Sequence, residues 1–280
     1  MTFDYSIHSS FIIHWTGKDI DDKYDKSWKD SDRGKSETNT ECTEAYIKRL
    51  GDILKYGLWM TEEKKNDLFF NKGNFRRTIP KISQTCFTEL KLSESRKHAR
   101  QYGRLGIGFK RSFVFDRFGR PLVYYGRHEN RKNDKFLEAC ARELKNADLL
   151  NFFKPMNSMQ NNKLDYDWYA ECEWRIIYFK ALLKKGLIID PRNTENQEVI
   201  SYYLSLTPEK KLKLKFLIPL DGWLSMIIYP SLNVKNRAQR DTSNGIINEI
   251  TRIKGIKDRG NRVEGRNWPI ELDLDACRNF

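Results

Sequence analysis

The chain has 280 residues, 39% of them hydrophobic and 32% charged, so it carries enough apolar side chains to build a folded core and does not resemble a disordered chain. Lysine and arginine outnumber aspartate and glutamate by 51 to 38, and the net charge of +13 favours contact with nucleic acid or another polyanion, although simple solubility explains it equally well. No apolar run approaches the roughly 18 residues of a membrane span, and the N-terminus lacks the order of a signal peptide, so we expect a cytoplasmic protein without membrane contact.

The first third of the chain predicts a strand, a loop and a helix. The run FIIHWTG at residues 11–17 is typical of a buried strand. We expect His14 to lie at the end of that strand. Residues 17–41 are almost wholly polar and have no apolar period, which predicts a loop. Residues 45–58 predict a helix that Gly57 ends, with one apolar stripe formed by Ile47, Leu50, Ile53, Leu54 and Leu58.

The remaining elements alternate between strands and helices. Residues 81–90 predict a short strand, Ser93 is expected to cap a helix that runs toward Gly103, and residues 106–125 read as strands that turn at 118–121. A helix is expected over 133–153, a central strand over 165–183, a strand over 222–230, a basic helix over 234–254 and a polar tail over 271–280. The pattern predicts one α/β or α+β domain over 1–280, with a core of residues 1–190 and a C-terminal elaboration of residues 191–280.

Several known site motifs are missing from this pattern. The five cysteines are scattered without a CxxC pair and are expected to be reduced thiols. The four histidines are dispersed and neither HExxH nor GxSxG occurs, so we predict no metal site. The lone GxG of GRLGIGF precedes a predicted strand, which argues against a dinucleotide-binding Rossmann turn.

A pair of glutamates stands out in the segment AECEWRI. In a strand, Glu171, Glu173 and Arg175 share one face because side chains repeat every two residues. Buried carboxylates beside an arginine carry a high desolvation cost, so their presence points to a functional site. The alternative is a solvated edge strand on which the two glutamates pair with Arg175 or with nearby lysines.

Four short motifs resemble those of the DarT-like ADP-ribosyltransferases: HWT at 14–16, L..IL..GL at 50–58, CFTE at 86–89 and the ExE strand at 171–173. Over nearly its full length the chain also resembles the abortive-infection phage-resistance family AbiGi. The second resemblance rests on CFTELKLSESRKHARQYGRLGIGF, ECEWRIIY, WLSMIIYPSL and the terminal LDLDACRNF. Together they imply a split, mostly antiparallel sheet flanked by helices, with NAD as the donor substrate.

The transferase resemblance implies a role for each matching residue. Breaking the bond between nicotinamide and ribose builds positive charge on the sugar, so a carboxylate there stabilises the transition state, a role that falls to Glu173. Glu171 is implied to select or orient the acceptor, and Arg175 to pair with a carboxylate or a phosphate.

The same resemblance implies an NAD pocket around the first strand. His14, counted among both the catalytic and the NAD-binding residues, is expected to hydrogen-bond the adenosine ribose. Trp15 and Thr16 shape the nicotinamide pocket with backbone and hydroxyl groups, Phe87 stacks on nicotinamide, and Thr88 occupies the position of the middle motif.

Three functions are compatible with these observations. The first is an ADP-ribosyltransferase-like component of a phage-defence or toxin–antitoxin system, which modifies a nucleic-acid or ribonucleoprotein target. The second is a non-catalytic antitoxin or regulator that binds a cognate toxin or DNA through basic surface. The third is a metal-dependent nuclease built on Asp165, Asp167, Glu171 and Glu173.

Overall fold

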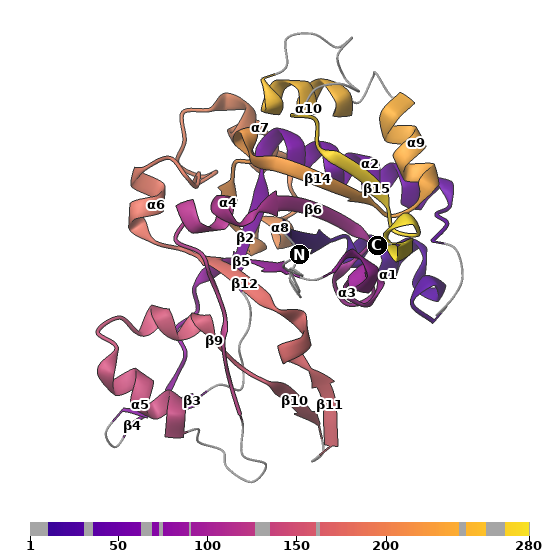
Figure 1. Cartoon of the computed structure of the whole chain (residues 1–280). Helices are drawn as coiled ribbons and strands as arrows, with labels where there is room; N and C mark the ends of the chain where they lie inside the picture. Colours follow the sequence, from indigo (N-terminus) through magenta and orange to yellow (C-terminus); the bar gives the residue numbers. More distant parts are fainter. Residues whose placement is uncertain are drawn as a thin grey trace, which may run out of the picture. The chain divides into compact units, whose positions relative to one another are not determined.

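The computed structural model describes residues 11–30, 36–62, 69–72, 75–89, 91–126, 135–160, 163–240, 245–255 and 267–279. The chain divides into two compact units, and each is described by itself. The first consists of Met1–Leu58, Phe87–Phe113 and Ile218–Phe280, and the second of Trp59–Cys86 and Val114–Leu217. Both units mix helices and strands, as the labels along the chain in Figure 1 show.

The boundaries of these units differ from the expected division at residue 190. Residues 218–280 belong to the first unit because β14 (Leu224–Tyr229) pairs with β6 (Leu105–Lys110) in its sheet. Residues 191–217 belong to the second unit. Whether residues 1–280 fold as one domain stays a prediction.

The sheet of the first unit has the strand order β5-β1-β6-β14-β15 among the described residues. β1 (Phe11–Thr16) is antiparallel to β5 (Ser83–Thr88) and to β6, β6 is antiparallel to β14, and β15 (Ile270–Asp273) runs parallel to β14. Of β5, Phe87 and Thr88 belong to this unit. The expectation of a mixed fold with a mostly antiparallel sheet flanked by helices is therefore confirmed.

The GxG motif has a packing role in β6. A Cβ atom on Gly108 would lie 2.7 Å from the Cβ of Met226, and one on Gly106 would lie 3.0 Å from a methyl group of Ile13. The two glycines therefore let side chains of β1 and β14 close over the central strand, and a larger residue at either position would force these neighbours to shift.

The helices of the first unit include the one that the sequence predicted best. α2 (Thr40–Tyr56) begins where the side chain of Asn39 accepts a hydrogen bond from the amide of Cys42, and it ends at Gly57, whose φ is +104°. Its predicted apolar stripe is buried, and Leu58 starts the strand β2 (Leu58–Glu62). The other helices are α1 (Lys18–Tyr24), α3 (Ser95–Tyr102), α9 (Leu232–Arg240) and α10 (Ile246–Lys254), with short 3-10 turns at Lys26–Asp30, Leu92–Glu94, Asp221–Trp223 and Ala276–Asn279.

The prediction of a loop over residues 17–41 is wrong for the described part of that segment. It holds α1 and a 3-10 turn because Ile20 and Trp28 are buried and because Asp21 and Asp25 bind Arg104. The side chain of Arg104 is 0% exposed, and its Nε donates to Asp21 Oδ1 at 2.8 Å while Nη2 donates to Asp25 Oδ2 at 2.7 Å.

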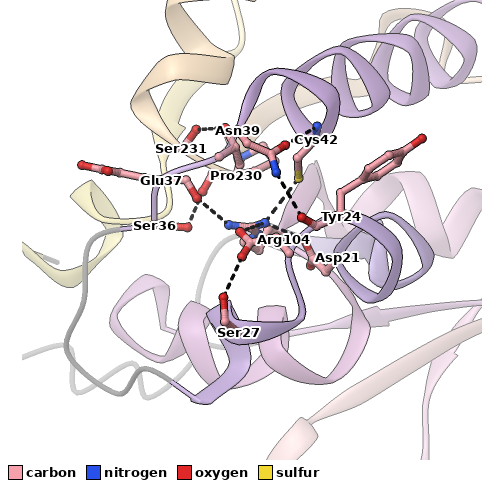
Figure 2. A network of polar contacts seen from close by, with 12 residues as sticks. Asp21, Tyr24, Ser27, Ser36, Glu37, Asn39, Cys42, Arg104, Pro230 and Ser231 are labelled. Carbon is pink, nitrogen blue, oxygen red and sulfur yellow. Dashed lines mark hydrogen bonds and ion pairs between the residues drawn. The ribbon is translucent and has the colours of Figure 1, made fainter.

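Figure 2 shows how widely spaced parts of the first unit converge on this arginine. Nη1 of Arg104 donates to the carbonyl of Glu37 at 3.1 Å, and Nη2 lies 3.5 Å from the sulfur of Cys42. The Trp28 ring lies under the guanidinium, 4.8 Å from ring centre to Cζ. We call Arg104, Asp21 and Asp25 the Arg104 cluster, and it ties α1 and the segment before α2 to the start of β6.

Two further predictions for the first unit are corrected. The expected polar tail at 271–280 includes β15 and the last 3-10 turn, where Leu274 and Cys277 are buried in the same apolar cluster as Ile13 and Trp15. The expected basic helix over 234–254 is two helices, since α9 ends at Arg240 and α10 begins at Ile246 after Gly245 at φ +70°.

The second unit is built from short strands and helices. β2 (Leu58–Glu62) lies between β13 (Leu214–Ile218) and β5, and β12 (Glu173–Ile177) pairs with β5 and with β7 (Arg120–Pro121). Two antiparallel hairpins are present, β3 (Phe69–Lys72) with β4 (Phe75–Thr78) and β10 (Asn157–Gln160) with β11 (Lys163–Asp167). β8 (Val123–Tyr125) and β9 (Phe153–Pro155) form a parallel pair. The helices are α5 (Lys135–Glu143), α6 (Lys180–Lys184), α7 (Gln197–Ser205) and α8 (Pro208–Lys213), with 3-10 turns at Ala147–Phe152 and Trp168–Glu171.

Three sequence predictions in and beside this unit are only partly right. The strands expected over 106–125 are interrupted by α4 (Arg111–Asp116), and the turn near 118 leads into β7 rather than into a hairpin partner of β6. The helix expected over 133–153 stops at Glu143, because Asn146 caps a separate 3-10 turn. The strand expected over 165–183 consists of β11, a 3-10 turn, β12 and α6. No helix among the described residues is both long enough and apolar enough to cross a membrane.

Candidate functional site

The first group of predicted site residues lies on β1 of the first unit. His14 is paired with Ile107 in the interior of the strand, which runs on to Thr16, so the prediction of a histidine at the strand end is wrong. Side chains alternate along β1, and Ile13 and Trp15 face the apolar cluster that includes Ala99 of α3. His14 and Thr16 therefore face the other side of the sheet.

Phe87 of β5 lies on the same side as His14. The two rings meet edge-on with centroids 5.8 Å apart, and Phe87 also contacts the rings of Phe109 and Phe113 at 6.0 and 6.2 Å. Only 1% of Phe87 is exposed. Stacking on nicotinamide, which stays a prediction, would require this side chain to leave its aromatic cluster.

Trp15 and Thr88 are joined by a hydrogen bond on the opposite face. The indole Nε1 of Trp15 donates to Thr88 Oγ1 at 3.1 Å, and the hydroxyl of Thr88 donates to the carbonyl of Ile13 at 3.4 Å. Both side chains are buried. This arrangement fastens β5 to β1, and any contact of Trp15 with a ligand falls to its backbone.

Thr16 is half-buried and takes part in a polar chain toward α1. Arg49 of α2 donates through Nη1 to Thr16 Oγ1 at 3.1 Å and through Nη2 to Asp19 at 2.7 Å. The hydroxyl of Thr16 is thus already engaged as an acceptor. The structure brings together the five predicted residues of this unit, but it divides their side chains between two faces of the sheet.

The second group, Glu171, Glu173 and Arg175, lies in the second unit with a fourth residue, Lys154 of β9. Lys154 Nζ donates to Glu171 Oε2 at 2.5 Å and to Glu173 Oε2 at 2.6 Å, and Arg175 Nε donates to Glu173 Oε1 at 2.5 Å. Both glutamates and Arg175 are buried, Glu173 being 4% exposed. We call these four residues the Glu173 cluster.

The backbone explains how two glutamates reach one lysine. Glu171 ends a 3-10 turn, Cys172 adopts a left-handed φ of +44°, and β12 begins at Glu173. The predicted alternation is therefore right for Glu173 and Arg175 and wrong for Glu171, which joins the cluster through Lys154. A positive φ at a non-glycine residue is uncommon, and here it redirects the chain between the two carboxylates.

The electrostatics of the cluster keep Glu173 ionised. Burial by itself raises the pKa of Glu173, but the charges of Arg175 and Lys154, with hydrogen bonds from Arg175 and from the Cys86 thiol, outweigh it and lower the pKa to about 2. Burial likewise lowers the pKa of Lys154, yet the two glutamates reverse that effect and raise it. Both charges therefore persist at neutral pH.

Neighbouring backbone groups fix the cluster in place. The amide of Glu173 donates to the phenol oxygen of Tyr124 at 2.8 Å, and Arg175 Nη1 donates to the carbonyl of Asn151 at 2.7 Å. Burial, more than the nearby carboxylates, raises the pKa of Tyr124. Residues from β8, β9 and β12 thus hold the two carboxylates in one orientation, as a preorganised site requires.

Lys154 is the residue that sequence reasoning missed. It is the single charged residue in LLNFFKPM, residues 149–156. A lone charge within an apolar stretch is a signal of a buried ion pair, since a lysine without a partner is rarely buried. That signal would have found the lysine but not its partners.

Metal binding finds no support among the described side chains. None of them form a group of three or more histidine, cysteine, aspartate or glutamate residues arranged to hold a metal ion. Asp165 and Asp167 lie on β11, whose side chains are outside the described set. The metal-dependent nuclease therefore stays an untested alternative.

Comparisons of the chain with protein-family models, with curated proteins and with solved structures found no match. The family resemblances drawn from the sequence motifs accordingly stay predictions.

Proposed function

We propose that the protein is an ADP-ribosyltransferase-like component of a bacterial phage-defence or toxin–antitoxin system, which transfers ADP-ribose from NAD to a nucleic-acid or translation-related target. The observation that carries the proposal is the geometry of Glu173, a buried carboxylate that accepts a hydrogen bond from a cation on each oxygen. Its carboxylate is 4% exposed, contacts two cations and has a pKa of about 2. The motif resemblance assigns the same residue to the reacting ribose.

The chemistry needs a carboxylate of this kind. Nicotinamide leaves with the electron pair of its bond to ribose, and the sugar carbon becomes positively charged until a nucleophile of the acceptor attacks it and loses a proton. A carboxylate that is anionic at every physiological pH can stabilise this charge without first giving up a proton. Lys154 and Arg175 would hold Glu173 in position, so that no reorganisation is needed in the transition state.

The fold class and the charge of the chain are compatible with the rest of the proposal. A mixed fold with a mostly antiparallel sheet is what the resemblance implies, and His14 is proposed to bind NAD. A net charge of +13 suits a nucleic-acid acceptor. The site contains no group of metal ligands among the described residues, and the proposed reaction requires none.

The test is NAD binding by calorimetry and nicotinamide release by the purified protein, beside Glu173→Gln and His14→Ala. Glu173→Gln keeps the shape of the side chain and removes its charge, so release is expected to fall by a factor of about 100 or more, while NAD binding persists. His14→Ala is expected to weaken NAD binding.

Asp21→Asn supplies the matched control, since it is the same isosteric change at a buried carboxylate bound to an arginine in the first unit. Release is expected to be retained by this variant wherever it remains folded. Full release by Glu173→Gln, or a folded wild-type protein that does not bind NAD at millimolar concentration, would overturn the proposal.

A specific observation favours a second candidate, the non-catalytic antitoxin or regulator. Each carboxylate oxygen of Glu173 already accepts a hydrogen bond from a cation, so the cluster is complete as a structural ion pair. On this alternative, growth phenotypes tolerate His14→Ala and Glu173→Ala, and binding of a toxin or of DNA falls steeply with salt because lysines and arginines carry it.

A further inference from the structure

The second unit carries a surface that the proposed function does not use. The two most exposed large apolar side chains among the described residues are Leu212, at 73%, and Leu204, at 64%. Leu204 lies in α7 and Leu212 in α8, and the exposed lysines Lys210 and Lys213 flank Leu212. We call these four residues, with Lys211, the leucine–lysine surface.

A capped turn joins the two helices that carry the leucines. Lys211 Nζ donates to the carbonyl of Leu204 at 2.7 Å and lies 5.9 Å from the ring centroid of Tyr203. Thr207 caps α8 through the amide of Lys210, and Pro208 occupies its first turn. Side-chain hydrogen bonds therefore fix the segment that connects the two leucines.

Neither leucine is needed for the core of the unit. α7 is anchored by Val199 and Tyr202, which are buried, and the hydroxyl of Tyr202 accepts a hydrogen bond from Trp59 Nε1 at 3.0 Å. α8 leads directly into the buried Leu214 of β13. Large apolar side chains that the core leaves outside, beside charged residues, are typical of an interaction surface.

We propose that the leucine–lysine surface docks an acidic segment of a partner protein, with apolar side chains of that segment covering Leu204 and Leu212. α8 contains three lysines and one glutamate, so a partner of negative charge is complementary. This inference goes beyond the proposed function and does not rest on it.

Other occupants fit these observations less well. A second copy of this chain would bring two surfaces of the same sign together, on a molecule whose net charge is +13. Nucleic acid contacts lysines and stacks on aromatic rings, and it would leave the two leucines uncovered. A membrane-surface helix needs a long apolar face, whereas α8 has six residues and one exposed leucine.

The experiment measures binding of short fluorescent peptides to the full chain by anisotropy. The probe is a helical peptide with leucines spaced one turn apart among glutamates. Its two references replace the leucines with serine or the glutamates with lysine. Single-stranded RNA and phosphatidylserine–phosphatidylcholine vesicles are tested in the same buffer.

The acidic leucine peptide is expected to bind best, and the double variant Leu204→Ser with Leu212→Ser is expected to raise its Kd at least about tenfold. Lys210→Gln with Lys213→Gln is expected to weaken binding and to flatten its dependence on salt. Leu232→Ser, which changes a leucine of α9 that is 56% exposed in the first unit, is the matched control and leaves the Kd unchanged.

Four outcomes would overturn the proposal. The acidic leucine peptide does not bind, the double leucine variant binds it as the wild type does, the acidic serine peptide binds equally well, or RNA or vesicles bind more tightly and depend on the two leucines.

Discussion

The two units of the molecule each bury an arginine among carboxylates, and the pKa of the carboxyl group shifts in opposite directions. In the Arg104 cluster, burial of Asp21 outweighs the charge of Arg104 and raises the pKa of that carboxyl (Figure 2). In the Glu173 cluster, burial is again the largest single effect, but Arg175 and Lys154 together reverse it. A buried carboxyl group beside an arginine thus has a raised pKa in one cluster and a lowered pKa in the other.

The ratio of cations to carboxylates explains the difference. Asp21 shares one arginine with Asp25, whereas Glu173 contacts both a lysine and an arginine. Burial alone therefore does not decide whether a carboxylate stays ionised. A single shared arginine leaves the pKa of Asp21 raised, whereas two cations lower the pKa of Glu173.

The largest effect is expected from removing the cation of the first unit. Arg104→Met leaves the fully buried Asp21 without its arginine, and breaking a buried pair in this way lowers the free energy of unfolding by about 3–5 kcal/mol. Urea unfolding at neutral pH measures the loss. Adding Asp21→Leu to the same chain is expected to restore part of it, and a loss below about 1 kcal/mol for Arg104→Met would contradict the comparison.

Removing one of the two cations in the second unit is expected to have a smaller effect. Lys154→Met leaves Arg175 beside Glu173, so a loss of about 2–3 kcal/mol is expected, and the pKa of Glu173 rises from about 2. Urea unfolding measures the first effect and carboxyl carbon NMR titration the second. An unchanged pKa would mean that Arg175 alone holds the charge.

The two carboxylates are expected to respond oppositely to acid. The pKa of Glu173 in the folded protein is about 2, below its ordinary 4.5, so its stabilisation is complete above pH 4.5 and is lost as the pH falls toward 2, by on the order of 3 kcal/mol. For Asp21 the effect of acid on stability is the opposite. Because its pKa is raised in the folded protein, protonation in acid favours the folded state.

The test is the free energy of unfolding, measured between about pH 6 and pH 2, where carboxyl groups titrate. Glu173→Gln is expected to flatten the acid-induced loss of stability. Asp21→Asn is expected to steepen it. Identical pH profiles for the two variants would contradict the assigned directions.

The smallest effect is expected from an exposed ion pair of the first unit. Arg237 Nε lies 2.9 Å from Glu44 Oε1, and the two side chains are 45% and 47% exposed. Because water screens such a pair, Arg237→Gln is expected to change the free energy of unfolding by less than about 0.5 kcal/mol in urea. A larger loss would show that burial is not what separates the strong pairs from the weak ones.

The sequence predicted those helices and strands that local patterns of residues are enough to locate. β1, α2, β5 and β14 carry apolar patterns or end signals that suffice to locate them, such as Gly57 after α2. α1 was missed because its polar sequence is held by Arg104, which lies 83 residues beyond Asp21 in the chain. No local pattern reports a partner at that distance.

The same reasoning applies to the candidate site. The spacing of Glu173 and Arg175 was predictable because strand alternation is a local rule. Lys154 was not, since it lies 19 residues before Glu173 and meets it through the pairing of other strands. The burial of Phe87 was not predictable either, because it depends on the rings of Phe109 and Phe113.

The discontinuous path of the first unit has a consequence during synthesis. Its segments are Met1–Leu58, Phe87–Phe113 and Ile218–Phe280, whereas the second unit is complete in sequence at Leu217. On a translating ribosome, both segments of the second unit emerge before β14 exists, so β6 can pair with β1 but not yet with β14. Until then the nascent chain exposes the edge of β6 that β14 will cover, so the sheet of the first unit is completed only after the whole second unit has been synthesised.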